Sequence, residues 1–215
     1  MGLRGLDLKD EYRSDRDNIF AEFFFECLGA CRRYDRCVDL LSINTLIAIS
    51  MSFDNFAAGQ ARMRMVTGHR FRADDLNILG RVFKQTAFEG RRIRSAKLRS
   101  LQNAVKKGQI QLKIAIPTSE DVTGSFSERI GIFTDAEGDA VAFTGTSGES
   151  FSEGSRDFES VDVFTSWNEP GRVSRKAEDF EDLWENRTRY VEVHDFEEAD
   201  RRNLLKYSAA WATRH

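Results

Sequence analysis

The chain has 215 residues, of which 40% are hydrophobic and 31% are charged, a composition typical of a globular protein rather than a disordered one. Its formal net charge at pH 7 is −3, so the overall charge does not favour a polyanionic partner. No apolar run approaches the roughly 20 residues of a membrane-spanning helix, and residues 1–18 lack the apolar core of a signal peptide. These features predict a soluble, cytoplasmic protein without a membrane partner.

The sequence pattern of the first half of the chain predicts alternating helices and strands. A polar N-terminal extension, residues 1–16, precedes a single domain that spans residues 17–215. A helix is predicted over 17–30 because apolar side chains recur there at helical spacing: Phe20, Phe23, Phe24, Cys27, Leu28 and Cys31. The elements predicted next are a short strand over 34–42, an apolar helix over 44–59 that ends at Gly59, and an alternating strand over 62–68.

Two helices and a strand are predicted in the middle of the chain. Asp74 and Asp75 begin a helix that has an apolar face, formed by Leu76, Leu79, Val82 and Phe83. A basic helix covers about 95–107 and ends at Gly108. The strand over 109–117 alternates strictly and has one apolar side, formed by Ile110, Leu112, Ile114 and Ile116.

Four strands and two helices are predicted in the last part of the chain. In chain order these are strands at 128–134, 139–145 and 160–166, a helix over 172–186, a strand over 190–196 and a final helix over 197–212. The helix over 172–186 is expected to present inward Val173, Ala177, Phe180 and Trp184. Strands that alternate with helices predict an α/β domain with a mixed sheet covered on both faces, and consecutive strands predict an antiparallel part.

The three cysteines, Cys27, Cys31 and Cys37, have C-x3-C-x5-C spacing and no neighbouring His. An odd number of cysteines without the spacing of a zinc site predicts reduced, partly buried thiols. The sequence therefore indicates neither a metal site nor a cofactor.

A basic segment interrupts this otherwise acidic chain. Residues 81–107 contain one acid, Glu89, and the following cations: Arg81, Lys84, Arg91, Arg92, Arg94, Lys97, Arg99, Lys106 and Lys107. Residues 135–200, in contrast, are strongly acidic. This uneven distribution indicates a local anion-binding face, and the alternative is a pair of solvated helices with scattered surface charge.

Six segments, taken together and in order, carry a resemblance to a known family: YDRCVDLLS, RMRMVTG, QIQLKIAIP, ERIGIFTDAEGDAVAFTGTSGES, DFESVDVFTSW and FEDLWENRT. Residues 17–207 resemble the phospholipase D-like (HKD) domain, in the subgroup associated with superfamily 2 helicases and with prokaryotic DNA-processing and anti-phage systems. The resemblance implies a mixed sheet flanked by helices. For a chain with one motif it also implies a homodimer, in which two-fold pairing completes the substrate groove. It also implies metal-independent phosphodiester cleavage, in which one His attacks phosphorus and its partner protonates the leaving group.

The signature of that family, H-x-K with a later Asp and then G-S-x-N, is altered in this chain. The resemblance places Ser127 at the His position, Arg129 at the Lys position and Asp135 at the Asp position. The segment that matches G-S-x-N is Gly145, Thr146, Ser147 and Gly148, and Glu159 matches a position that is usually acidic in the subgroup. Arg129 retains a phosphate-binding cation, whereas a Ser hydroxyl does not replace an imidazole and Gly148 supplies no side-chain donor.

Two further features near these strands are candidates for function. His69 follows the strand over 62–68, where side chains of α/β sheets face a ligand crevice, so it is the catalytic candidate outside the motif, and the alternative is a surface residue. The loop GTSGES has backbone N–H groups that suit a phosphate, although a Gly/Ser-rich turn between strands is common.

These observations favour a catalytically degenerate domain that binds nucleic acid or mediates assembly, as a homodimer or with a helicase or another defence-system protein. The alternatives are a divergent metal-independent nuclease or phosphodiesterase and a purely structural dimerisation or docking protein. Non-specific binding to the phosphate backbone is expected through Arg91, Arg92, Arg94, Lys97, Arg99, Lys106, Lys107 and Arg129. Because only Phe83 and Phe88 lie among these cations, base stacking is not expected.

Overall fold

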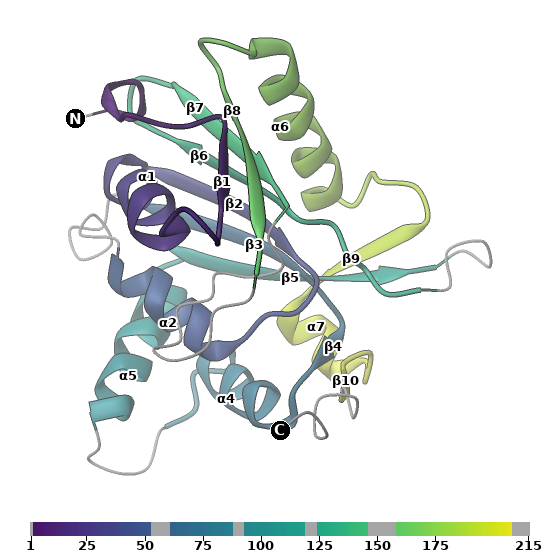
Figure 1. Cartoon of the computed structure of the whole chain (residues 1–215). Coiled ribbons are helices and arrows are strands. Elements are labelled where there is room, and N and C mark those ends of the chain that lie inside the picture. The colour runs from purple at the N-terminus through teal and green to yellow at the C-terminus, as the bar shows by residue number, and fades with distance from the viewer. Residues whose placement is uncertain (1, 53–60, 88–92, 119–123, 146–157, 208–215) are drawn as a thin grey trace.

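A computed structural model describes residues 2–52, 61–87, 93–118, 124–145 and 158–207, and an eight-stranded mixed sheet lies at its centre (Figure 1). The strand order is β1-β8-β7-β6-β2-β3-β5-β9. The strands are β1 (Glu11–Arg13), β2 (Arg33–Val38), β3 (Arg62–Gly68), β5 (Ile110–Pro117), β6 (Ile130–Thr134), β7 (Ala140–Thr144), β8 (Ser160–Thr165) and β9 (Val191–Asp195). A small second sheet pairs β4 (Arg70–Phe71) with β10 (Lys206–Tyr207).

Strand direction divides the main sheet into two halves. β2, β3 and β5 are parallel to one another, whereas β6, β7 and β8 form an antiparallel meander that joins β2 through β6. β9 and β1 are antiparallel strands at the two outer edges. The parallel strands all end at one end of the sheet, where β7 also ends and where β6, β8 and β9 begin, and we call this the carboxyl end. The opposite end is called the amino end.

Helices cover both faces of the sheet, so the structure confirms the α/β class predicted from the sequence (Figure 1). One face packs against α1 (Phe25–Ala30), α2 (Ile43–Ser52), α4 (Ala73–Phe83), α5 (Ile93–Lys106) and α7 (Phe196–Arg201). The other face packs against α6 (Pro170–Trp184). A short 3-10 helix, η1 (Leu3–Gly5), and a π-helix, η2 (Phe20–Phe24), complete the elements of the described residues.

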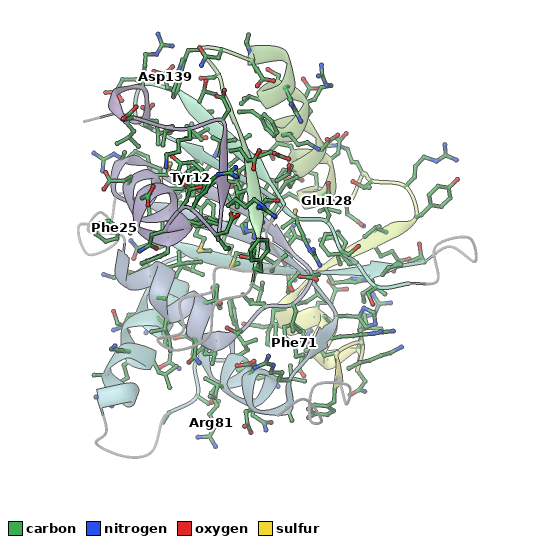
Figure 2. All side chains as sticks on the ribbon, in the orientation of Figure 1. Tyr12, Phe25, Phe71, Arg81, Glu128 and Asp139 are labelled. Carbon is green, nitrogen blue, oxygen red and sulfur yellow. The ribbon has the colours of Figure 1, made fainter. Side chains whose placement is uncertain are left out.

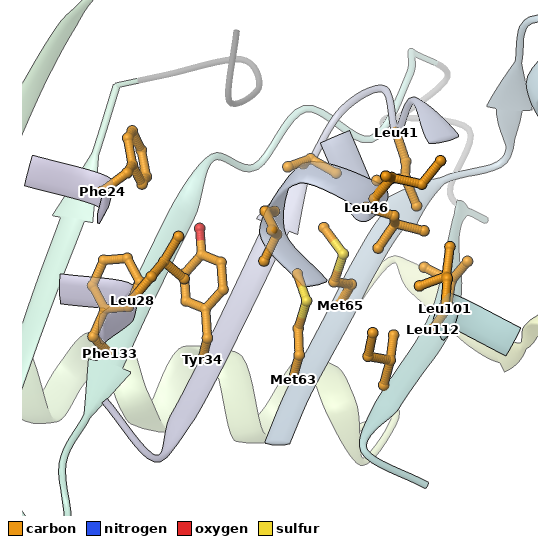
Figure 3. Packing of buried hydrophobic residues seen from close by; sticks show 14 of the residues in the cluster. Phe24, Leu28, Tyr34, Leu41, Leu46, Met63, Met65, Leu101, Leu112 and Phe133 are labelled. Carbon is orange, nitrogen blue, oxygen red and sulfur yellow. The ribbon is translucent and has the colours of Figure 1, made fainter. Parts of the chain in front are cut away.

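Aromatic rings gather at one side of the larger core, on the α1–α2 face, next to Met63 and Met65 (Figure 3). Tyr34 of β2 stacks on Phe133 of β6, with ring centroids 4.4 Å apart and an interplanar angle of 10°. Phe143 of β7 lies beside them, and Phe23 and Phe24 of η2 meet its ring edge-on at 5.4 and 5.2 Å. The rings therefore hold η2 against the antiparallel half of the sheet, and Tyr34 links this cluster to β2.

An ion cluster attaches α6 to its face of the sheet. Arg64 of β3 donates to both carboxylate oxygens of Asp35, at 2.7 and 2.9 Å, and to Glu181 of α6 at 2.6 Å. Its guanidinium also lies over the rings of Phe180 and Trp184, at 5.0 and 5.3 Å from their centroids. The hydrogen bond from Arg64 holds the pKa of Glu181 below its ordinary value.

The apolar faces expected from periodicity are confirmed. Ile110, Leu112, Ile114 and Ile116 all pack into the larger core, as do Leu76, Leu79, Val82 and Phe83 of α4. Val173, Ala177, Phe180 and Trp184 pack between α6 and the sheet. α5 ends as expected at Gly108, where a φ of +68° lets Gln109 N–H bond to the Ala104 carbonyl in a Schellman motif.

Some expected elements differ in the structure. The helix expected over 197–212 ends at Arg201, because Asn203 adopts a φ of +55° and the bond from Leu204 N–H to the Ala199 carbonyl closes a Schellman motif. The part of this prediction over 208–212 lies outside the described residues. The expected helix over 17–30 begins at Phe20 and starts as a π-helix, and the strand over 34–42 ends at Val38. The helix over 44–59 is described only as far as Ser52, so its expected end at Gly59 lies outside the described residues.

The first residues of the chain join the sheet, although sequence analysis set residues 1–16 apart as an extension. β1 pairs with β8, with Tyr12 opposite Val161. Leu3 is fully buried, and its N–H donates to the Asp135 carboxylate at 2.8 Å. The strand was missed because it has three residues, two of them charged.

We predict that Gly131→Ala lowers the free energy of unfolding by about 1–3 kcal/mol. A Cβ at this β6 position would overlap the Phe143 ring, which lies directly on the glycine. Urea denaturation measures the change. Gly80→Ala is the control, because nothing lies within 4 Å of a Cβ there and alanine is favoured in a helix such as α4 by about 0.5–1 kcal/mol. Equal stability of the Gly131→Ala and wild-type proteins would contradict this packing.

Candidate functional site

Most of the described residues that the sequence resemblance assigns to the family signature lie at the carboxyl end of the sheet. Ser127 and Arg129 directly precede β6, Gly145 directly follows β7, and Glu159 directly precedes β8. Because Ile130 pairs with Thr144, and Thr144 with Asp162, the three segments lie side by side. Thr146 and Gly148 lie outside the described residues.

Arg129, at the Lys position, is held in an ion pair. Its Nη2 lies 2.8 Å from Oδ2 of Asp39, the residue that follows β2. The two side chains are 42% and 24% exposed, so the pair is in contact with solvent and contributes at most about 1 kcal/mol to stability. Asp39 therefore neutralises much of the charge with which Arg129 would meet a phosphate.

Ser127, at the His position, is exposed and has no hydrogen-bond partner among the described residues. Its neighbour Glu128 points toward α6, and burial raises its pKa, with Lys176 acting in the opposite direction. A hydroxyl becomes a nucleophile when an adjacent base accepts its proton. The described residues provide no such base for Ser127.

The backbone conformation of Gly145 explains why this position requires a glycine. Its φ is +111°, outside the range that other residues readily adopt. A Cβ at this position would also lie 2.5 Å from the backbone oxygen of Ser160. The glycine lets β7 leave the sheet while it remains close to β8.

Glu159 contributes through its backbone, which extends the pairing of β1 with β8. Ser14 N–H donates to the Glu159 carbonyl at 3.0 Å, and Glu159 N–H donates to the Ser14 hydroxyl at 2.9 Å. The Glu159 side chain is half-buried. This position therefore fixes the outer edge of the carboxyl end.

Asp135 lies at the amino end, on the far side of β6 from Ser127 and Arg129. Figure 2 shows this separation through two labelled neighbours, Glu128 at the carboxyl end and Asp139 at the amino end. The buried Asp135 carboxylate accepts from the backbone N–H groups of Glu137 and Asp139, at 3.1 and 2.9 Å, as well as from Leu3. Its role in the structure is to close the β6–β7 turn and to anchor the N-terminal segment.

His69, the candidate outside the motif, follows β3 and is only 6% exposed. Its backbone carbonyl accepts from Lys206, and its ring Nδ1 is buried without a hydrogen-bond partner. Burial lowers the pKa of His69, and the positive charges of Lys206 and Arg70 lower it further. The ring is therefore a neutral imidazole with little access to a substrate in solution.

The basic segment lies away from Arg129. Its described part comprises the end of α4 and the whole of α5, two helices on the α1–α2 face of the sheet. Lys106 and Lys107 come just before β5 begins at the amino end. At about 3.3 Å per residue, the eight residues of β5 separate the two ends by roughly 26 Å. Arg91 and Arg92 lie outside the described residues, and the side chain of Arg94 is not described.

The sequence matches no protein-family model and no curated protein. Solved structures do match. NucT from Helicobacter pylori has a TM-score of 0.50 and 8% sequence identity to this chain, over 81% of this chain and 94% of NucT. NucT has the phospholipase D-like architecture.

This chain has a phospholipase D-like fold. Two other solved structures of this type also match: phosphatidylserine synthase from Haemophilus influenzae Rd KW20 (TM-score 0.48, 8% identity, 90% of this chain and 41% of that one) and yeast tyrosyl-DNA phosphodiesterase (TM-score 0.37, 10% identity, 62% and 25%). The chain thus spans less than half of either protein. The match to NucT supports the fold alone, and the helicase-associated subgroup stays a prediction from the sequence.

The described part of the chain contains buried thiols and no membrane-spanning helix. Cys27, Cys31 and Cys37 are free and buried, and burial raises the pKa of Cys31 to about 12. In the described ranges no helix has the length and apolarity to cross a bilayer, and His, Cys, Asp and Glu side chains form no cluster that suits a metal ion.

Sequence reasoning missed the partner of Arg129. Asp39 follows a buried strand, and its place at the carboxyl end of a parallel strand was the available signal. The contact itself joins residues 90 positions apart, so only the pairing of β2 with β6 reveals it.

We predict that the protein loses stability as pH falls from 8 to 5.5, and that His69→Gln makes this loss smaller. The folded-state pKa of His69 is lowered, so its contribution is complete above the unfolded pKa of about 6.5 and declines as pH falls below it, because the unfolded chain then binds the proton more tightly. Urea midpoints at both pH values measure the change. Identical pH dependence in wild type and variant would contradict a buried neutral His69.

Proposed function

We propose that this chain is a catalytically degenerate phospholipase D-like module that binds nucleic acid through its phosphate backbone. The observation that carries the proposal is the set of exposed cations on α4 and α5. Arg81, Lys97, Lys106 and Lys107 have no ion-pair partner among the described residues, whereas Lys84 pairs with Asp200. Although the chain has a net charge of −3, this cluster gives a local positive potential that attracts a polyanion such as nucleic acid.

Packing brings several of these cations together. Gln102 of α5 donates to the backbone carbonyls of Arg81 and Thr86, so the middle of α5 lies against the end of α4. Arg99 and Lys106 are three and four residues from Gln102 and therefore share its side of the helix. Figure 2 shows Arg81 directed away from the sheet. We call Arg81, Arg99 and Lys106 the basic surface.

The loss of catalysis is inferred from the carboxyl end of the sheet. The family reaction requires an imidazole that attacks phosphorus and a second imidazole that protonates the leaving group. Ser127 is at the position of the first, and pairing two copies of this chain would only bring together two serines. The two histidines in the described part of the chain, His69 and His194, are buried and do not take the place of that imidazole.

The wider role that we propose is that of a binding or assembly component in a DNA-processing or anti-phage complex. A homodimer and a helicase or other defence-system partner belong to this proposal. Support comes from the sequence resemblance, in which single-motif chains pair across a two-fold axis.

We predict that the protein hydrolyses neither bis-(p-nitrophenyl) phosphate nor single- or double-stranded DNA, with EDTA or with divalent cations. Loss of one general acid–base residue typically lowers a rate by about 10²–10⁴-fold, and here the nucleophile and the acid are the same residue type. Nitrophenolate release and gel electrophoresis measure the activity. Turnover that His69→Ala abolishes would overturn the proposal. The triple substitution Ser127→His, Arg129→Lys and Gly148→Asn is the converse test and is expected to restore a trace.

We predict that binding to a short DNA duplex weakens steeply with salt, with a log–log slope of about −3 to −5 for four to six phosphate contacts. The double variant Arg81→Glu, Lys106→Glu should reduce the magnitude of that slope by about 2, since each phosphate contact accounts for about 1. The control is Arg175→Glu, Arg187→Glu, which makes the same charge change on α6 and beyond it. Equal loss of affinity in both double variants would point to net charge rather than to the basic surface.

A further inference from the structure

Two exposed aromatic side chains lie at the carboxyl end of the sheet. Phe158, two residues before β8, is 65% exposed, and Tyr190, directly before β9, is 48% exposed. Only two other large apolar side chains of the described residues are exposed to this degree, Phe25 on α1 and Tyr207 on β10. Exposure of an aromatic ring to water is energetically unfavourable. Two exposed rings at one end of a sheet therefore indicate a surface that binds a partner.

An arginine accompanies each ring. The guanidinium of Arg13, at the end of β1, lies over Phe158, 4.8 Å from the ring centroid. The guanidinium of Arg189 lies 5.1 Å from the centroid of Tyr190 and donates to its hydroxyl at 3.1 Å. Each pair therefore offers a flat apolar surface next to a cation that suits a phosphate.

Tyr190 is also held in an unfavourable backbone conformation. Its φ is +67°, a region that large side chains rarely adopt. The Tyr190 carbonyl accepts from Thr118 N–H at 2.9 Å, which extends the pairing of β5 with β9 and fixes the strained residue in place. An aromatic residue kept in this region and exposed to solvent is the kind of strain that accompanies binding sites.

The two pairs lie on either side of Arg129. Six inter-strand spacings separate β8 from β9, or roughly 29 Å at about 4.8 Å each, and Arg129 precedes β6, two spacings from β8. Strand order therefore places three groups in succession across the carboxyl end: the Arg13–Phe158 pair at β1 and β8, Arg129 at β6 and the Arg189–Tyr190 pair at β9. The basic surface, in contrast, lies on the helices of the α1–α2 face.

We propose that a single-stranded nucleic acid lies across the carboxyl end of the sheet, with bases stacked on Phe158 and Tyr190 and phosphates facing Arg13 and Arg189. This inference rests on the proposed function and adds strand selectivity to it. A duplex does not fit, because its bases are already stacked on one another and do not present their faces to a protein ring. Sequence analysis expected backbone contacts alone, since these aromatic residues lie far from the basic segment in the chain.

Charge at this end supports stacking as the source of selectivity. Asp39 pairs with Arg129 and Asp15 pairs with Arg13 at 2.7 Å, while Glu159 lies nearby, so the cations are partly neutralised. Phosphate attraction at the carboxyl end is therefore modest. The preference for a single strand should consequently persist at a salt concentration that removes duplex binding.

The test is fluorescence anisotropy with a labelled 12-nucleotide oligo(dT) and with a 12-base-pair duplex. Phe158→Ala and Tyr190→Ala should each weaken oligo(dT) binding by about 5- to 150-fold, the range for loss of one stacked base, and leave duplex binding unchanged. Phe158→Tyr and Tyr190→Phe should retain binding because they keep a ring. The matched control is Phe25→Ala, which removes an equally exposed ring on α1 and should change neither affinity.

The outcomes separate this inference from the function on which it rests. Unchanged oligo(dT) affinity in both alanine variants, or an equal loss for oligo(dT) and duplex, overturns the stacking site. Duplex binding that depends on the basic surface while those variants have no effect leaves the proposed function standing and removes only this inference. If the wild-type protein binds neither probe at about 50 mM salt, both fail. Photocrosslinking of oligonucleotides that contain 5-iodouracil should identify the peptides of Phe158 and Tyr190, and crosslinks confined to α5 would contradict the site.

Discussion

The pairing of β2 with β6 is the constraint on which the rest of the molecule depends. It joins the parallel half of the sheet to the antiparallel half, and the stacked rings of Tyr34 and Phe133 keep water out of this junction. Such stacking contributes about 0.5–1.5 kcal/mol beyond the burial of the rings. Because β2 ends where β6 begins, the same pairing brings Asp39 to Arg129 and so determines the electrostatics of the carboxyl end.

The sequence predicted those parts of the fold in which one local pattern decides the structure. Strict alternation in β5 and helical spacing in α4 and α6 identified the buried faces, because burial of an apolar stripe dominates the energy of such elements. The site was predictable only as a set of positions in the chain. The anchoring role of Asp135 and the strained backbone of Tyr190 depend on residues distant in sequence or on backbone angles, which periodicity does not record.

The two ends of the sheet differ in the side chains that they present. At the amino end, the carboxylate of Asp135 is enclosed by backbone donors and serves stability. At the carboxyl end, the positions that match the family signature lie side by side, yet an exposed hydroxyl and a neutralised guanidinium occupy those of the nucleophile and its cation. The described carboxyl end therefore presents exposed cations and aromatic rings, whereas the described amino end presents a buried carboxylate held by backbone donors.

The place of β1 has a consequence for how the chain reaches this structure. Tyr12 pairs with Val161, so β1 can join the sheet only after β8 has formed. Closing a loop of that length costs chain entropy that only the completed meander repays, which makes the step slow compared with local helix formation. During synthesis β1 therefore leaves the ribosome well before β8 and pairs only after β8 has followed. Until β1 pairs, the edge of β8 stays open to pairing with other chains.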